Sequence, residues 1–276
     1  MALSVTTNIA AMNAYRNLSN TQNSISSSME KLSSGLRINR AADDAAGLAI
    51  SEGLKSQVNG LTVASRNAQD GINVVQTAEG ALNEVQSILQ RVRDLSVQAA
   101  NDSNSTDSRA AIQTEVTQLG SELTRLSTAT DFNGTKLLDG SASALKFQVG
   151  ANGSADNVIT VDLSSANVGA IGTAVSALTF TDNTAAQASI TAVDAQLKTV
   201  STARATLGAV QNRFQHTINS VNIATENLSA AASTITSTDM AKEMVNFTKA
   251  QVLSQAGTAM LAQANQLPQS ILKLLQ

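Results

Sequence analysis

The sequence contains no cysteine and no tryptophan, and it has one proline and one histidine in 276 residues. Without cysteine there is no disulfide framework, no cysteine-ligated metal centre and no thiol nucleophile. With His216 as the single histidine, the chain cannot be a metalloprotease of the paired-histidine type, and any catalytic triad that uses histidine would have to use this residue. Charged residues make up 14% of the chain, against about 25% in an average soluble domain. The net charge of −3 comes with no basic block, so nucleic acid is not expected as a partner.

Long apolar runs are absent as well. No stretch approaches about 18 consecutive apolar residues, so the sequence predicts no membrane insertion. The first eight residues lack the basic segment, the apolar block and the small-residue cleavage site of a secretory signal peptide. Aromatic residues are only 2% of a chain that is 42% hydrophobic. The core must therefore be built by packing many small aliphatic side chains.

Apolar side chains recur in heptads over most of the chain, which is typical of helices that pack in coiled coils. The pattern predicts helices at about 4–33 and 42–100, a third after the polar loop 101–107, a fourth at about 186–235 and a fifth from about 238 onward. The fourth helix would be roughly 75 Å long, longer than a globule of this size is wide. Its apolar residues fall seven apart without a gap: Val193, Val200, Leu207, Phe214, Val221, Leu228 and Ile235.

Between about 131 and 184 the period changes from heptads to alternation. Apolar residues alternate with polar ones at 145–149 and again at 159–163, on either side of a glycine-containing turn. This pattern predicts a β-hairpin, followed by a connection rich in glycine, alanine and threonine at about 165–184. The expected fold is mainly α: an elongated rod of long antiparallel coiled-coil-like helices with a small β-hairpin region.

The two ends of the chain carry heptads but almost no charge. Residues 1–29 contain one charged side chain, Arg16, and residues 250–276 contain one, Lys273. A helix without charge on its outer face can be packed on every side without the cost of desolvating ions. We therefore expect the two ends to pair with each other and with copies of the same chain. The expected seam residues are Leu18, Ile25 and Leu32, with Tyr15, Gln22, Met29 and Leu36 in parallel, and Leu253, Gly257, Met260, Ala264, Leu267, Ile271 and Leu274.

Several segments, taken in order, resemble the bacterial flagellins. The resemblance covers about residues 1–165 and 185–276, and it is to a short form that lacks the large variable outer domains. The segments that carry it are ALSVTTNIAA at 2–11, LSSGLRIN at 32–39, ADDAAGLAI at 42–50, QRVRDLSVQ at 90–98, DFNG at 131–134 and LAQANQ at 261–266.

The resemblance implies a structural subunit that polymerises into the helical filament of the bacterial flagellum, which serves motility. It implies no enzymatic activity, no cofactor and no metal site. Residues 1–41 and 236–276 would form an inner terminal coiled coil. Residues 42–235 would form a middle helical domain, with the hairpin and a short outer connection at about 131–184.

The resemblance also implies partners and a location. The subunit would be exported unfolded through a type III channel and would end outside the cell in the flagellar filament. Its partners would be other copies of itself, an export chaperone at the C-terminal region, the filament cap proteins and the hook–filament junction proteins. The monomer would be recognised by innate immune receptors, Toll-like receptor 5 among them.

Three sets of site residues follow from the matched positions. Toll-like receptor 5 recognition, or contact with the next subunit, falls on Arg91, Leu95 and Glu115. The domain connector holds Gly35, Arg37, Asn39, Asp43 and Asp44, and we expect capping or inter-subunit contact there rather than acid–base chemistry, because adjacent helix residues point about 100° apart. The inner-tube packing residues are Leu18, Ile25, Leu32, Leu253, Met260, Leu267, Leu274 and Leu275.

Two other functions remain open at this point. A hook–filament junction protein shares related ends but would not grow long filaments alone. A secreted coiled-coil effector or receptor agonist would act as a monomer, and electron microscopy of seeded protein would separate it from a filament subunit. An enzyme is the weakest alternative, because no nucleophile–base pair, metal cluster or phosphate loop is visible.

Overall fold

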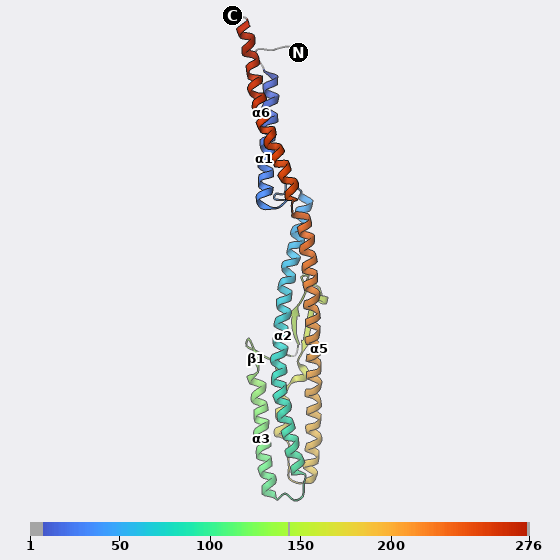
Figure 1. Cartoon of the computed structure of the whole chain (residues 1–276). Helices are drawn as coiled ribbons and strands as arrows, with labels where there is room; N and C mark the ends of the chain where they lie inside the picture. The colour runs from blue at the N-terminus through green and yellow to red at the C-terminus, as the bar shows by residue number, and fades with distance from the viewer. Residues whose placement is uncertain (1–7, 143, 275–276) are drawn as a thin grey trace. The chain divides into compact units, whose positions relative to one another are not determined.

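The structure is a computed structural model that describes residues 8–142 and 144–274, with residues 267–274 traced by their backbone alone. The expectation of a mainly α fold with long helices and a small hairpin is confirmed (Figure 1). No helix of the described part combines the length and the apolarity needed to cross a membrane. The helices are α1 (Ile9–Ser34), α2 (Ala45–Ala99), α3 (Thr106–Ala129), α4 (Val168–Ser176), α5 (Asn183–Thr236) and α6 (Met240–Leu274).

The chain divides into two compact units. The first, here called the terminal unit, comprises Met1–Ser56 and Asn227–Gln276, and the second, the middle unit, comprises Gln57–Glu226. The backbone leaves its helical path at residues 35–44 and again at residues 237–239, both within the terminal unit. Because α2 and α5 each run through the boundary, the two units share two continuous helices.

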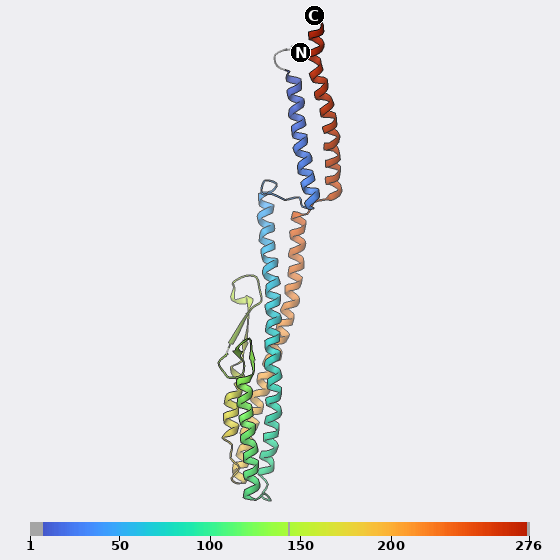
Figure 2. The same ribbon diagram turned by 90° about the vertical axis from the view of Figure 1, so that its left-hand side faces the viewer.

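The core of the middle unit lies between α2 and α5, which run side by side in both views (Figures 1 and 2). The predicted heptad positions of the fourth helix are buried from Val193 to Val221, and α2 buries an apolar stripe from Ala68 to Ala99. α3 adds Ile112, Val116 and Leu123 to the same core. Burial of large aliphatic side chains at about 25 cal/mol per Å² is the main stabilising contribution here.

Gly71 allows α2 and α5 to pack closely at one point. A Cβ atom at Gly71 would lie 2.5 Å from the ring of Phe214, which is fully buried. The Phe214 ring packs edge-on against Phe147 of the hairpin, with centroids 5.6 Å apart. The small residue on α2 thus receives the largest buried side chain of α5 and ties the hairpin to both helices.

The predicted hairpin is confirmed as β3 (Ala144–Gln148) paired antiparallel with β4 (Val158–Asp162). The register sets Leu145 opposite Val161, and Val161 is fully buried. A second pair, β1 (Asp131–Phe132) and β2 (Thr135–Lys136), forms in a segment for which no strand was predicted. Its two-residue turn has positive φ at Asn133 and Gly134, the backbone that Asn-Gly favours in tight hairpins.

The connection expected at about 165–184 contains a helix, α4, that the sequence reading missed. Asn167 caps it, because its side chain accepts a hydrogen bond from the Ala170 amide at 3.0 Å. Val168, Ile171 and Val175 are buried at helical spacing. Glycine has a low helix propensity, but Gly172 lets α4 pack closely on α3.

We predict that replacing Gly172 by alanine destabilises the middle unit. The added Cβ would lie 2.9 Å from the Thr124 backbone nitrogen and 3.0 Å from the Gly120 carbonyl oxygen, so two helix backbones must separate. Overpacking of this kind costs about 1–3 kcal/mol. The measurement is the free energy of unfolding in urea, followed by circular dichroism.

Gly208→Ala is the matched control for Gly172→Ala. Its Cβ would meet nothing within 4 Å, so alanine should stabilise α5 by up to about 1 kcal/mol through its higher helix propensity. Equal effects from the two substitutions would contradict the close approach of α3 and α4.

Candidate functional site

α1 and α6 of the terminal unit lie antiparallel along a seam of mostly small side chains (Figures 1 and 2). Two contacts fix the register. The Asn8 side chain donates to the Ala264 carbonyl at 2.7 Å, and the Ser28 hydroxyl donates to Glu243 at 2.6 Å. The least exposed positions are Ala11, Ala14, Leu18, Thr21, Ile25, Ser28 and Leu32 on α1, and Glu243, Phe247, Ala250, Ser254, Gly257, Leu261 and Ala264 on α6.

The structure places the expected seam residues in two groups. Leu18, Ile25 and Leu32 lie between α1 and α6, as do Gly257 and Ala264. Tyr15, Gln22, Met29, Leu253 and Met260 are exposed, so no segment of the same chain covers them. The side chains of Leu267, Ile271 and Leu274 and the whole of Leu275 lie outside the described residues. The helices approach closely at Gly257, where an added Cβ would lie 3.3 Å from the Leu18 side chain.

The connector expected at residues 35–44 joins α1 to α2 and bonds with the end of α5. Gly35 ends α1 with a left-handed φ of 72°, where glycine has no steric penalty. The Arg37 amide donates to the Thr236 carbonyl at 2.7 Å, and the Arg37 guanidinium donates to the Ile235 carbonyl at 2.7 Å. The Arg37 cation thus satisfies carbonyls that the end of α5 leaves without helical partners.

The two predicted connector carboxylates, Asp43 and Asp44, accept backbone hydrogen bonds. Asp44 accepts from the Gly47 amide at 2.8 Å and so caps the start of α2. Asp43 accepts from the amides of Asn39 and Arg40 at 3.1 and 3.0 Å. This arrangement positions the chain and presents no carboxylate pair facing a cleft.

A third carboxylate, Glu30, belongs to the connector although the sequence reading did not include it. It accepts from the Arg40 guanidinium at 2.8 Å and from the Asn39 side chain at 2.6 Å. The hydrogen bond from Arg40 and then that from Asn39 lower the pKa of Glu30 below its ordinary value of 4.5. The backbone amides of Arg40 and Asn39 likewise lower the pKa of Asp43 below 3.8. No sequence motif marked Glu30, because its partners lie nine and ten residues further along the chain.

The predicted recognition residues separate into an exposed pair and a buried residue. The Arg91 guanidinium of α2 donates twice to Glu115 of α3, at 2.9 and 2.8 Å, and both side chains are about half exposed. Leu95 is 3% exposed and belongs to the core of the middle unit. Leu95, which was expected to share a recognition surface with Arg91 and Glu115, therefore does not lie on the surface, because it belongs to the buried face of α2.

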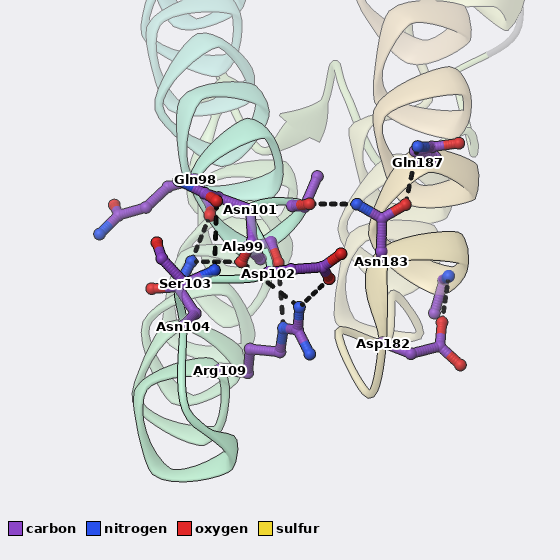
Figure 3. Close-up of polar contacts among 12 residues, drawn as sticks. Gln98, Ala99, Asn101, Asp102, Ser103, Asn104, Arg109, Asp182, Asn183 and Gln187 are labelled. Carbon is purple, nitrogen blue, oxygen red and sulfur yellow. Dashed lines mark hydrogen bonds and ion pairs between the residues drawn. The ribbon is translucent and has the colours of Figure 1, made fainter.

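Side chains from three segments close the end of α2 (Figure 3). Arg109 of α3 donates to the Ala99 carbonyl at 3.1 Å and forms an ion pair with Asp102, also at 3.1 Å. Asn104 donates to the Gln98 carbonyl at 2.6 Å, and Asn183 at the start of α5 donates to the Ala100 carbonyl. These contacts satisfy carbonyls that a helix end leaves without partners. They hold the end of α2 to the starts of α3 and α5.

Among the residues that the structure describes, the middle unit has an open groove but no set of side chains arranged for catalysis. An open groove of about 760 Å³ is bordered by α5, near Arg213 and His216, and by the hairpin loop at Ala151 and Asn152. In the described ranges no three residues among histidine, aspartate and glutamate come close enough to hold a metal ion.

We predict that acid loosens the connector. Glu30 and Asp43 have lower pKa values in the folded chain than in the unfolded one. Their contribution to stability is therefore complete above about pH 4.5 and is lost as the pH falls through the folded values. In an NMR titration, the amide resonances of Asn39 and Arg40 should shift with a midpoint below pH 3.8.

Two substitutions control this titration. Asp43→Asn should abolish the shift of the two amides, and Arg40→Ala should raise the midpoint of the Glu30 carboxyl carbon towards 4.5. A Glu30 midpoint that stays unchanged in Arg40→Ala would contradict the assigned cause.

Comparison with known proteins relates both ends of the chain to one family. Residues 5–143 match the bacterial flagellin N-terminal helical region, and residues 190–275 match the bacterial flagellin C-terminal helical region. The chain is 54% identical to a flagellin of Halalkalibacterium halodurans and 49% identical to a flagellin of Bacillus subtilis, each over 98% of both chains. Among solved structures it is similar to a Bacillus cereus flagellin, at 29% identity with a TM-score of 0.49, over 60% of this chain and 94% of that chain.

Proposed function

The chain belongs to the bacterial flagellins, so it is a structural subunit of the extracellular flagellar filament and not an enzyme, and we propose how its parts share that task. Residues 1–41 and 236–276 form the inner coiled coil through which subunits assemble. Residues 42–235 form a middle domain that folds on its own core and carries the hairpin and a short outer connection. Leu18, Ile25 and Leu32 hold the inner coiled coil together, and Leu253 and Met260 remain available for other copies.

One observation supports this division: α1 and α6 bury few side chains and leave several large apolar side chains exposed. In α1 a single residue, Ser28, is classed as buried, and in the part of α6 with described side chains only Ala250 and Ala264 are. Met12, Tyr15 and Met29 on α1 are more than half exposed. Isolated helices with so little buried apolar area are marginal in water. Assembly would supply the missing burial.

We predict that α1 and α6 gain protection from hydrogen exchange when subunits assemble. In the dilute monomer their amides should exchange quickly, because local opening costs little where few apolar contacts are made. In seeded filaments the same amides should exchange slowly, while the core of α2 and α5 stays protected in both states. The measurement is hydrogen-exchange mass spectrometry on monomer and filament of the full chain. Equal protection of α1 in the two states would contradict the proposal.

The proposal extends to the route of the subunit and to its accessory partners. We propose type III export of the unfolded chain, with secretion to the distal end of the filament. The apolar residues exposed on α6, among them Val252 and Leu253, support an export chaperone at the C-terminal region, since such a surface promotes association before export. The filament cap and hook–filament junction proteins would contact the same terminal unit.

Innate immune recognition of the monomer is the second part of the proposal. The Arg91–Glu115 pair joins α2 to α3 on an exposed face, and we propose this pair as the part of the Toll-like receptor 5 contact that touches the receptor. Leu95 acts from the core by positioning Arg91 one turn away. The same face can contact a neighbouring subunit, because a polymer buries surface that a monomer exposes.

We predict that Arg91→Ala weakens binding of the monomer to the receptor ectodomain roughly tenfold, the effect of losing one hot-spot side chain. The fold should change little, since an exposed ion pair contributes about 0.2–1 kcal/mol. The measurement is receptor affinity together with the free energy of unfolding.

Two variants control this measurement. Arg125→Ala removes another exposed pair, with Glu122, and should leave the affinity unchanged. Leu95→Ala should lower the free energy of unfolding by about 2–5 kcal/mol. Its receptor affinity must therefore be corrected for the fraction of unfolded protein. Unchanged binding by a folded Arg91→Ala monomer would contradict the assignment.

A further inference from the structure

The sequence contains three Asn-Gly pairs, at residues 59–60, 133–134 and 152–153. In such a pair the backbone nitrogen of the glycine can attack the side-chain carbonyl carbon of the asparagine, because glycine has no Cβ to obstruct the approach. The reaction needs a backbone that can adopt this geometry and a nitrogen that can lose its proton. The structure places the three pairs in three different settings, so they should not react alike.

Two of the pairs lie where their backbone is held. Asn59 and Gly60 lie inside α2, where the helical hydrogen bonds engage the Gly60 amide. Asn133 and Gly134 form the tight turn between β1 and β2, and the Gly134 amide donates to the Asp131 carboxylate at 3.2 Å. A negative charge beside an amide opposes the loss of its proton. Both glycine nitrogens are therefore poor nucleophiles in the folded chain.

The third pair, Asn152 and Gly153, lies in the exposed loop between β3 and β4. Among the residues that the structure describes, none accepts a hydrogen bond from the Gly153 amide. An added Cβ at Gly153 would meet nothing within 4 Å. The Gly153 nitrogen is thus neither engaged in a hydrogen bond nor covered.

Two side-chain amides converge on the backbone carbonyl oxygen of Asn152. Gln148 donates to this oxygen at 2.7 Å, and Asn157 donates to it at 3.0 Å. The carbonyl belongs to the same peptide group as the Gly153 nitrogen, so the negative charge left when that nitrogen loses its proton spreads onto the oxygen. Two donors at the oxygen stabilise this charge, as the donors of an oxyanion hole do. The arrangement therefore favours the reactive form of the nucleophile.

The rest of the loop holds this arrangement in place. Gln148 also donates to the Gly150 carbonyl at 2.9 Å. Ala151 packs on α2 at Gly60, where an added Cβ would lie 2.9 Å from the Ala151 Cβ. The donors are therefore in position before the reaction begins, which is the condition under which such donors are most effective.

We propose that Asn152 is a site of self-modification, with water as the co-reactant. The Gly153 nitrogen loses its proton and bonds to the side-chain carbonyl carbon of Asn152. The bond from that carbon to the side-chain nitrogen breaks, ammonia leaves with the proton, and a five-membered succinimide ring remains. Water then adds to one of the two ring carbonyls and opens the ring, leaving aspartate or isoaspartate at position 152. One water is consumed, one ammonia is released, and nothing is oxidised or reduced.

The product changes the charge of a groove in the middle unit. Asn152 borders the open groove of about 760 Å³ that Arg213, His216 and Asp156 also line. The conversion replaces a neutral amide at this groove by a carboxylate, and isoaspartate also lengthens the backbone of the loop by one methylene group. Each converted subunit therefore differs from an unconverted one in both the charge and the shape of this surface.

The test measures deamidation at each of the three pairs in the full chain. Folded monomer and chain in urea are incubated in the same mildly alkaline buffer, digested in acid and analysed by peptide mass spectrometry, with isoaspartyl methyltransferase labelling as a second readout. In urea the three pairs should react at similar rates. In the folded monomer Asn152 should react about tenfold faster than Asn59 and Asn133, or more, because the backbones of those two must open first. Equal rates at the three pairs of the folded monomer would overturn the inference.

Two variants separate the chemistry from the mobility of the loop, and circular dichroism checks that both are folded. Gln148→Glu replaces a donor by an acceptor and should slow the reaction at Asn152 about two- to tenfold, the effect of one hydrogen bond. A loop that was merely loosened would react faster, so an unchanged or higher rate would overturn the assigned role. In Gly153→Ala the added Cβ meets nothing within 4 Å, so the fold should be kept while the methyl group obstructs the attack. Reaction of Gly153→Ala at the rate of the unmodified chain would overturn the mechanism.

Discussion

The proposed role of the terminal unit depends on one property: α1 and α6 bury little apolar surface within a single chain. Its seam is made of alanine, serine, threonine and glycine as much as of leucine, and several larger apolar residues, among them Tyr15, Met29 and Met260, lie exposed outside it. The middle unit shows the contrast, because Val193, Leu207 and Phe214 are buried at successive heptad positions of α5. With roughly 25 cal/mol gained per Å² of apolar burial, the middle unit can fold alone, whereas α1 and α6 gain most when other copies cover them.

The connector at residues 35–44 joins α1, which buries little apolar surface, to α2, which packs in the core of the middle unit. Where α1 ends at Gly35, the chain must turn into α2 while α5 turns into α6. Arg37 bonds to the last carbonyls of α5, Asp44 caps the first turn of α2, and Glu30 holds Arg40. All three contacts are charge-assisted, so they are stronger than neutral hydrogen bonds. The connector therefore keeps a defined path between the helices even when α1 and α6 make few contacts of their own.

The sequence predicts most of the middle unit and much less of the terminal surfaces. Large apolar residues repeated over many heptads, as from Val193 to Val221, place all the apolar side chains on one face of the helix. The pattern therefore predicted both the long helices and the face that forms the core. α4 was missed because Gly172 reads as a breaker until its contact with α3 is known. Tyr15 and Leu253 were placed in an apolar seam without a stated partner, because periodicity shows that a helix has an apolar row but not whether the same chain or another copy covers it. Leu95 was placed at the surface for a related reason: the match to a family position carries no measure of burial.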